Sequence, residues 1–296
     1  MRFVASPAVR AYATEQGVDL STVSAATGRA TLSREDVDQF LSGNGPAASA
    51  GSNHRRYWDV DHGQFGPVTR EPVPRLARIA AANLSAANAE IPQVTHHNRA
   101  DMRAIEAFRK SLADEAAARG VKLTALAFHV KALARCLVEF PRFNSSLSVD
   151  GETLILKHYV HVGIAVDTPH ALMVPVIRDA DRSGLWRIAA EVADLSSRAQ
   201  SRKIRGEEMG GASMSISNLG GIGGSAFTPI VNPPEVAILG LSRTEIVPVW
   251  AEDQWLPVPM VPLDLSYDHR VINGAEAARF LARYAALLSD PRRMLV

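Results

Sequence analysis

The sequence predicts an α/β protein in two parts, a small all-helical unit followed by a larger domain with a mixed β-sheet and flanking helices. Two observations lead to this prediction. Residues 1–42 contain two helix starts within a length that can bury only a small core. From residue 75 onward, alanine-rich helical segments alternate with short apolar runs that are typical of strands.

Two helices are predicted in the N-terminal unit, residues 1–42. Ser6 precedes a proline, which is favoured at the first position of a helix, and Gly17 ends that helix. A loop is expected next. Ser33 then caps a second helix, and Asp36 follows three residues later in a pattern like a capping box.

A flexible linker is predicted at residues 43–65, because its first part is rich in Gly, Ser, Ala and Asn. The larger domain, residues 66–296, follows it. Helices of this domain are expected at residues 75–89, 101–119, 124–139, 185–201 and 274–288. Strands are expected at residues 93–99, around 153–178, and at 213–218, 235–242 and 259–267.

Composition excludes several classes of function. The 32 Lys and Arg nearly balance the 31 Asp and Glu, so we expect neither a nucleic-acid partner nor binding to a charged membrane surface. No stretch has the ~20 apolar residues of a membrane span. The N-terminal residues show no long apolar core followed by a cleavage site, so we expect no secretory signal. The single cysteine, Cys136, lies in an apolar run and fits a core residue in a reducing cytoplasm.

The most informative stretch reads Ser-Tyr-Asp-His-Arg-Val-Ile-Asn-Gly-Ala, residues 266–275. His269 follows an apolar run, lies between two charged residues, and precedes an Asn-Gly turn. This arrangement suits an imidazole held at the end of a strand as a general base. A buried structural histidine is the alternative interpretation of a lone histidine.

A second informative stretch begins at residue 213. Small polar and apolar residues alternate up to Leu219, which predicts a strand, and a glycine-rich bend follows. The bend lacks the glycine spacing of a dinucleotide-binding fingerprint. It also lacks the Lys-Ser/Thr ending of a phosphate-binding loop. A tight β-turn is therefore the alternative interpretation of this bend.

Two adjacent histidines, His96 and His97, fall in a predicted strand. Adjacent side chains of a strand point to opposite faces, so the two imidazoles are poor joint ligands. No cysteine or acidic cluster stands beside them. We therefore expect no metal site.

Together, the two motifs resemble the catalytic domain of the dihydrolipoamide acyltransferases, the core components of 2-oxo acid dehydrogenase complexes. The family's Asp-His-Arg motif, with a glycine four residues after the arginine, corresponds to residues 268–274, and its Ser-Asn-Leu-Gly strand end corresponds to residues 217–220. Similar blocks occur at residues 141–147, 159–169, 174–178 and 227–240. The resemblance implies a chloramphenicol-acetyltransferase-like α/β fold for residues 66–296. Asn-Gly-Ala after the motif is most similar to the branch that transfers acetyl groups in pyruvate dehydrogenase.

The N-terminal unit resembles the peripheral subunit-binding domain of the same family. The matching segments are residues 6–10, 17–20 and 34–37. Thr14 and Thr31, however, occupy the positions at which the family has arginines that bind acidic surfaces of partner proteins. The resemblance therefore implies decarboxylase and dihydrolipoamide dehydrogenase components as partners, and the two threonines predict that this unit binds them weakly or not at all.

The family resemblance implies acetyl transfer between dihydrolipoamide and coenzyme A, which is a substrate here. Thiols have pKa values near ~8.5, so a base is needed at neutral pH, and the resemblance assigns that role to His269. Ser217 is implied as the hydrogen-bond donor to the tetrahedral oxyanion. Asn273 is expected to orient the site by hydrogen bonds, and its amide cannot act as a base. Phe143 and Asn144 are implied as coenzyme A contacts.

The resemblance also implies an assembly. The family core is a homotrimer with histidine and serine contributed by adjacent subunits, and trimers build a larger cage. The sequence shows no lipoyl domain before the small unit, so either the chain is a fragment or lipoyl groups are expected from another domain or chain, acting in trans. Two alternatives stay open: a non-catalytic scaffold of such a complex, and a free-standing acyltransferase with another acyl donor.

Overall fold

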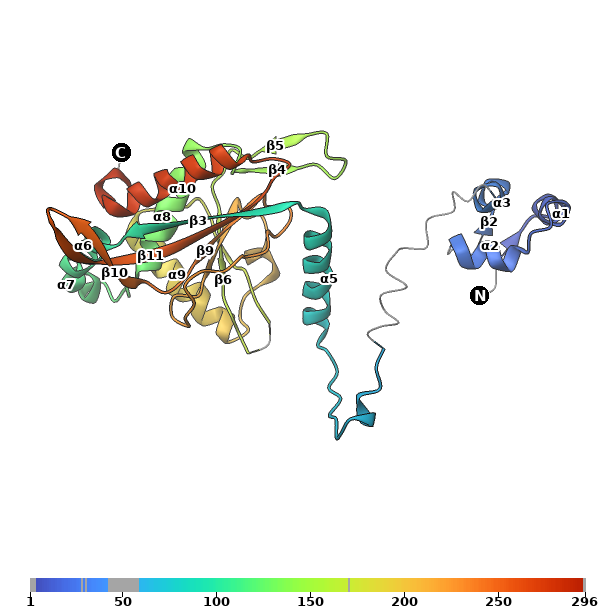
Figure 1. Cartoon of the computed structure of the whole chain (residues 1–296), viewed down its shortest axis with the longest axis horizontal. Helices are drawn as coiled ribbons and strands as arrows, with labels where there is room; N and C mark the ends of the chain where they lie inside the picture. Colours follow the sequence, from blue (N-terminus) through green and yellow to red (C-terminus); the bar gives the residue numbers. More distant parts are fainter. Residues whose placement is uncertain (1–3, 28, 30, 42–58, 170, 295–296) are drawn as a thin grey trace. The chain divides into compact units, whose positions relative to one another are not determined.

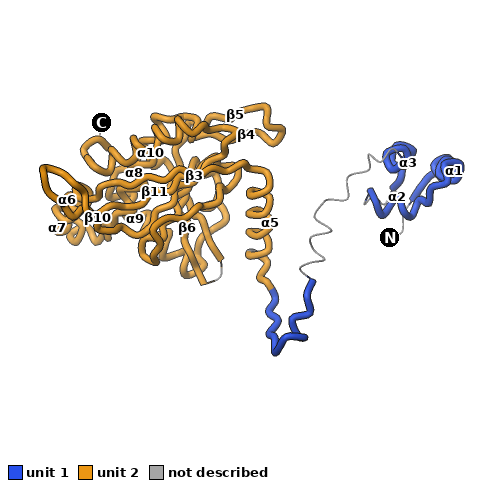
Figure 2. The backbone as a smooth tube through the Cα atoms, viewed as in Figure 1, with its two compact units in different colours: residues 1–72 blue, residues 73–296 orange. Residues whose placement is uncertain are grey.

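The computed structural model describes residues 4–27, 29, 31–41, 59–169 and 171–294. The chain divides into two compact units, residues 1–72 and 73–296, and each is described by itself (Figure 2). Residues 43–58 of the predicted linker lie outside the described residues. The rest of that linker contains a short 3₁₀ helix, η1 (His62–Gln64).

The described residues of the N-terminal unit form three helices, with two short strands between and before them. The helices are α1 (Pro7–Glu15), α2 (Leu20–Thr27) and α3 (Arg34–Leu41). The strands β1 (Val4–Ala5) and β2 (Thr31–Leu32) pair in parallel. A small apolar core joins these elements, and its buried residues are Ala5, Ala13, Leu20, Val23, Leu32 and Val37.

The helix ends of this unit follow the predicted capping pattern. Ser6 Oγ accepts a hydrogen bond from the backbone N–H of Val9, and Gly17 adopts a left-handed φ of +67°. Ser33 N–H donates to the Asp36 carboxylate at 2.8 Å, and Asp36 N–H donates back to Ser33 Oγ at 3.3 Å. Both predicted helix starts are therefore confirmed.

The loop predicted between these two helices is wrong, because residues 20–27 form α2. Asp19 starts this helix, since its carboxylate accepts the N–H of Ser21 at 2.9 Å. Leu20 and Val23 then bury the apolar side of α2. The Ser, Thr and Ala content of the segment concealed its short apolar stripe.

The larger unit is built on a mixed seven-stranded sheet. Its strand order is β10-β11-β9-β8-β6-β7, and β3 pairs with β11. The neighbours β6, β8 and β9 run parallel, and the other pairs are antiparallel. The strands are β3 (Gln93–Asp101), β6 (Val162–Ala165), β7 (Val176–Ile177), β8 (Met214–Asn218), β9 (Ala237–Leu241), β10 (Glu245–Ala251) and β11 (Gln254–Asp268).

Most helices of this unit pack on the sheet or on one another, whereas the helix of residues 75–90 extends away from the start of β3 (Figure 1). A hairpin of β4 (Ser145–Leu147) with β5 (Leu154–Leu156) forms a separate two-stranded sheet. The helices are α5 (Arg75–Glu90), α6 (Arg103–Ser111), α7 (Ala113–Ala118), α8 (Ala125–Glu139), α9 (Leu185–Gln200) and α10 (Gly274–Ser289). The main core joins α8, α9 and α10 to the sheet, and its largest buried side chains include Phe128, Leu133, Leu137, Phe143, Phe280 and Tyr284.

Two parts of the larger unit differ from the sequence prediction. The helix expected at residues 101–119 is divided at Leu112 into α6 and α7. Strand β10 and the first residues of β11 were not predicted, because prolines such as Pro248 and Pro257 argue against central strands. These two prolines face each other at the edge of the sheet, where a missing N–H is tolerated.

Candidate active site

Ser217 lies near the end of β8, in the middle of the sheet. It is opposite Ala165 of β6 and Gly240 of β9, and it is partly buried. The chain then bends, since Asn218 Oδ1 accepts the N–H of Gly220 at 2.9 Å. Gly224, with a φ of +85°, continues the bend in a conformation that favours glycine. The predicted strand and glycine-rich bend are therefore both present.

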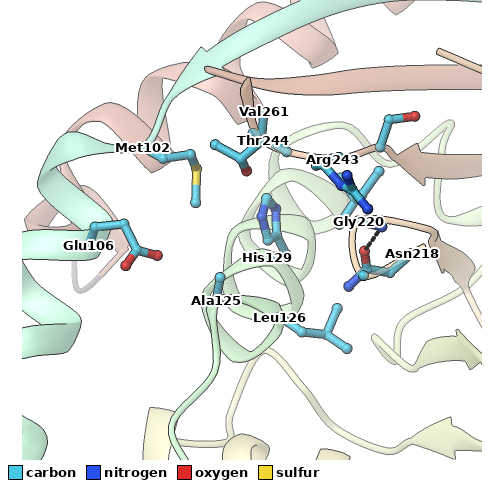
Figure 3. A pocket seen from close by; sticks show the side chains of 13 residues that line it. Met102, Glu106, Ala125, Leu126, His129, Asn218, Gly220, Arg243, Thr244 and Val261 are labelled. Carbon is cyan, nitrogen blue, oxygen red and sulfur yellow. Dashed lines mark hydrogen bonds between the residues drawn. The ribbon is translucent and has the colours of Figure 1, made fainter. Parts of the chain in front are cut away.

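A cavity of about 410 Å³ opens where the chain bends after Ser217 (Figure 3). In Figure 3, Glu106 lies on one side of the cavity, and Arg243 lies on the other beside Gly220. Arg243 also donates from Nη2 to the carbonyl of Ile222 at 2.9 Å, which ties the glycine-rich bend to the end of β9. Among the described residues, the buried Oγ of Ser242 in the cavity lining has no hydrogen-bond partner.

His129 also lines this cavity, and its contacts identify it as a structural histidine. Its Nδ1 lies 2.7 Å from Tyr284 Oη, and the residue is 3% exposed. Burial lowers the pKa of His129 to about 4, so its imidazole is neutral at pH 7. Sequence reasoning did not single out His129, Glu106 or Arg243.

His269 lies just beyond the end of β11, in an exposed turn. Its backbone N–H donates to the carbonyl of Pro92 at 3.1 Å. Its ring is tilted by 36° against the ring of Tyr267, with 5.7 Å between the ring centres. No hydrogen bond reaches the His269 ring within the part of the chain that the structure describes. The backbone of His269 is thus held in place, and its imidazole is available to hydrogen-bond with a bound molecule.

The residues on either side of His269 hold this turn. The Asp268 carboxylate is buried and accepts from the Arg270 guanidinium at 2.7 Å, and this pairing raises the pKa of Arg270. The Asp268 carbonyl accepts the N–H groups of Val271 and Ile272 at 3.0 Å each. The Asp-His-Arg sequence therefore builds a compact turn that presents its central histidine outward.

Asn273 ends the turn as the N-cap of α10, because its Oδ1 accepts the N–H of Glu276 at 2.9 Å. Arg142 supports the same turn from another part of the chain. Its Nη2 donates to the carbonyl of Val271 at 2.5 Å, and its Nε lies 3.6 Å from the Glu276 carboxylate. Arg142 was missed at the sequence level, although it lies inside the family-like block of residues 141–147.

Phe143 and Asn144, predicted to contact coenzyme A, lie in the interior. The Phe143 ring is fully buried and stacks on Phe280 with 4.0 Å between ring centres. The Asn144 amide donates to the carbonyls of Lys157 at 3.1 Å and Tyr159 at 2.8 Å. Neither residue lines the cavity of Figure 3. Their coenzyme A role stays a prediction.

The sheet register separates Ser217 from His269 within one chain. Ser217 is opposite Gly240, and Gly240 is opposite Asp264 of β11. His269 follows Asp264 by five residues along the chain. At ~3.3 Å per residue and ~4.8 Å between strands, the two Cα atoms are about 19 Å apart. One chain therefore cannot bring both side chains to the same small reacting group.

Other reactive groups were also placed by the structure. Cys136 is fully buried in α8, and burial raises the pKa of its thiol. Among the described residues, no group of three or more His, Cys, Asp or Glu side chains could hold a metal ion. None of the helices in the described ranges is long and apolar enough to cross a membrane.

The chain matches two protein families. Residues 65–296 match the family described as 2-oxoacid dehydrogenases acyltransferase (catalytic domain), and residues 3–31 match the e3 binding domain. These matches identify an acyltransferase catalytic domain that follows an e3 binding domain. The chain belongs to the 2-oxoacid dehydrogenase acyltransferase family.

Among curated relatives, the dihydrolipoyllysine-residue acetyltransferase component of the pyruvate dehydrogenase complex of Pseudomonas aeruginosa is 47% identical over 299 residues. The match covers 99% of this chain and 55% of that protein. The corresponding component of Azotobacter vinelandii is 46% identical over 300 residues, which are 99% of this chain and 47% of that protein. The chain thus spans about half the length of these relatives.

Two solved structures share 50% identity with this chain at a TM-score of 0.79, and each match covers 80% of this chain and 98% of the solved one. One is the dihydrolipoamide acetyltransferase of Azotobacter vinelandii, studied for the role of a serine, a histidine and an asparagine in its catalytic mechanism. The other is the cubic core of a pyruvate dehydrogenase multienzyme complex. The α/β fold and the family resemblance predicted from sequence are both confirmed.

Proposed function

We propose that this protein transfers an acetyl group between dihydrolipoamide and coenzyme A, as the acyltransferase core of a pyruvate dehydrogenase complex. One observation carries the proposal: Ser217, His269 and Asn273 share the spacing of the catalytic residues studied in the Azotobacter vinelandii enzyme. In both chains the same number of positions separates the serine from the histidine, and the asparagine follows four positions later.

His269 is the general base of this reaction. Only a few per cent of a thiol with a pKa near ~8.5 is ionised at neutral pH. The imidazole takes the proton from the coenzyme A thiol while the coenzyme A sulfur attacks the carbonyl carbon of S-acetyldihydrolipoamide. The tetrahedral intermediate then collapses by breaking the bond to the dihydrolipoamide sulfur, and that sulfur takes the proton from the imidazolium. The exposed ring on a fixed turn supports this role.

Ser217 donates its hydroxyl hydrogen to the oxyanion of the tetrahedral intermediate. Removal of one such donor typically costs a factor of about 10²–10³ in rate. Asn273 acts on the histidine-bearing turn, since its side chain caps α10 directly after it. The amide holds the turn in place and transfers no proton.

Two copies of the chain must build one site. The estimated ~19 Å between Ser217 and His269 in one chain supports a site in which His269 of one subunit meets Ser217 of its neighbour. We therefore propose a homotrimer in which every interface contains one such site. The likeness to the cubic core of a pyruvate dehydrogenase complex supports assembly of trimers into a larger cage.

The cavity beside the bend is a candidate site for a part of coenzyme A away from its thiol, because the lining residues Leu241 and Val261 lie on the opposite face of the sheet from the Ser217 side chain. A volume of about 410 Å³ falls in the range of small-molecule pockets. Arg243 and the unpartnered hydroxyl of Ser242 supply polar groups at its wall. The acetyl-bearing lipoyl group would come from a separate lipoyl domain acting in trans, in the cytoplasm.

The N-terminal unit is the proposed docking site for dihydrolipoamide dehydrogenase and decarboxylase components, and its contacts support weak docking. The guanidinium of Arg29 is paired with the buried Asp36 at 2.7 Å. The guanidinium of Arg34 lies over the Tyr12 ring at 4.0 Å. Both basic groups already interact within the unit, so binding an acidic partner would compete with these contacts.

An acetyl-transfer assay with free dihydrolipoamide and acetyl-coenzyme A tests the function. We expect the wild type to be active, and His269→Ala to lose nearly all activity without a change in melting temperature. His62→Ala removes another exposed histidine and serves as the control. An inactive wild-type protein would support the scaffold alternative, and a His269→Ala variant within about tenfold of wild type would remove the histidine from the mechanism.

A further inference from the structure

One row of residues crosses four strands of the sheet. Ser217 of β8 is opposite Gly240 of β9, Gly240 is opposite Asp264 of β11, and Asp264 is opposite His97 of β3. Figure 1 shows β9, β11 and β3 side by side. Directly opposite residues of neighbouring strands point to the same face of a sheet. Ser217 therefore shares its face with Asp264 and His97.

Asp264 and His97 form a close pair on this face. His97 Nδ1 lies 2.6 Å from Asp264 Oδ1. The Asp264 side chain is 1% exposed, whereas the His97 side chain is 53% exposed. A buried carboxylate is costly unless hydrogen bonds satisfy it, so His97 supports Asp264 from the solvent side.

The second oxygen of Asp264 holds a different segment of the chain. Its Oδ2 accepts the backbone N–H of Phe227 at 3.2 Å. The Phe227 ring occupies the space that a side chain at residue 240 would need, because a Cβ built on Gly240 would lie 2.7 Å from the ring. Phe227 therefore lies over the one residue that separates Ser217 from Asp264 in the row.

Phe227 begins a segment, residues 227–235, that lies across the same face of the sheet. Hydrogen bonds between this segment and residues of the strands hold it there. The N–H of Val231 donates to Gln93 Oε1 at 2.7 Å. Further on, Ser215 Oγ donates to the carboxyl group of Glu235 at 2.9 Å. Of these three hydrogen bonds, the one that Asp264 accepts from Phe227 is nearest in sequence to the glycine-rich bend that follows Ser217.

The order of the row excludes a hydrolase-type triad. In such a triad the imidazole lies between serine and carboxylate. Here the carboxylate of Asp264 lies nearer to Ser217, and His97 is three strand spacings, roughly 14 Å, from the serine. The pair therefore acts on the surroundings of Ser217, through the segment that Asp264 holds.

We propose that Asp264 and His97 are positioning residues that hold Phe227 beside Ser217 and thereby shape the wall along which a thiol substrate binds. This inference rests on the proposed acetyl transfer. The wall contributes to binding of the ground state, whereas Ser217 itself belongs to β8 and keeps its place when the wall moves. Loss of the pair should therefore raise KM and leave kcat nearly unchanged.

The test compares three variants of the full-length chain. His97→Leu removes the hydrogen-bond donor to Asp264, and His97→Asn keeps a donor close to the position of Nδ1. His96→Leu removes the neighbouring histidine, which points to the other face of β3, and is the control. Melting temperatures establish that each variant folds.

Two measurements decide the outcome. In His97→Leu we expect hydrogen exchange of the Phe227 amide to accelerate about tenfold, while the Val231 amide stays within about twofold. We expect KM for coenzyme A or dihydrolipoamide to rise about tenfold with kcat within threefold, and His97→Asn to restore both values.

The proposal is overturned if Phe227 exchange is unchanged, if neither KM rises, or if His96→Leu has the same effect. Hydrogen exchange needs no turnover, and binding of coenzyme A can be titrated on its own. A wild-type protein without acetyl transfer would therefore refute the proposed function, and Phe227 exchange together with coenzyme A affinity would still decide the role of the pair.

Discussion

Mixing two inactive variants tests whether adjacent subunits share the active site. His269→Ala lacks the base and Ser217→Ala lacks the oxyanion donor, so each variant alone should be nearly inactive. Coexpression in equal amounts would place both kinds of chain in one oligomer. If an interface takes its histidine from one subunit and its serine from the next, some interfaces receive both intact residues.

The fraction of activity that the mixture should recover follows from the separation of Ser217 and His269. A distance of about 19 Å within one chain leaves no intact site inside a single variant subunit. In a randomly mixed cyclic oligomer, the histidine donor carries His269 in half of the interfaces, and the serine donor carries Ser217 in half of them. Both conditions hold in about a quarter of the sites, so about a quarter of wild-type activity should return.

The assay is acetyl transfer at fixed total protein, and a second mixture provides the control. Wild type mixed equally with the double variant Ser217→Ala/His269→Ala should retain about a quarter of its activity if the sites are shared, and about half if each chain holds its own site. No recovery in the first mixture, together with half activity in the second, would refute a shared site.

Three further predictions concern single groups. Ser217→Ala should lower kcat by about 10²–10³ with a much smaller change in KM, because the oxyanion exists only beyond the ground state; a pure KM effect would make Ser217 a binding residue. Burial raises the pKa of Glu235 to about 7 from 4.5, so its protonation stabilises the folded state fully below pH 4.5, and that contribution is lost as the pH rises towards 7. Unfolding at several pH values should therefore show wild type losing about 1–3 kcal/mol over this range relative to Glu235→Gln, and parallel curves would contradict the assignment. Calorimetric titration of the full chain with dihydrolipoamide dehydrogenase should show weak binding that Thr14→Arg with Thr31→Arg tightens about tenfold or more, whereas nanomolar binding by the wild type would disprove the expected weakness.

Local patterns in the sequence predicted the parts of the site that depend on neighbouring residues. The turn around His269 is closed by an ion pair between Asp268 and Arg270, its two neighbours in the sequence. Residues of the motif itself therefore determine the shape of the turn. The strand that carries Ser217 and the bend after it follow from alternation and from glycine. The alternation of helices and strands likewise predicted most elements of the larger unit, since each has its own apolar period.

Contacts between distant residues could not be predicted in this way. Asp264 and His97 are 167 positions apart and meet only because β11 pairs with β3 in one register. Arg142 likewise reaches the carbonyl of Val271 across 129 positions of the chain. The separation of Ser217 from His269 also depends on strand order, which no local pattern encodes.

The cap that Asn273 provides fixes the direction in which its amide can interact. Its oxygen accepts the N–H of Glu276 with one of two lone pairs, so both N–H bonds of the NH₂ group and one lone pair remain for any molecule that enters beside the turn. The amide can therefore still donate two hydrogen bonds but accept only one more, which favours an acceptor group beside it. The first turn of α10 thus sets the orientation of the Asn273 amide at the edge of the site, and because the amide does not titrate, this orientation is independent of pH.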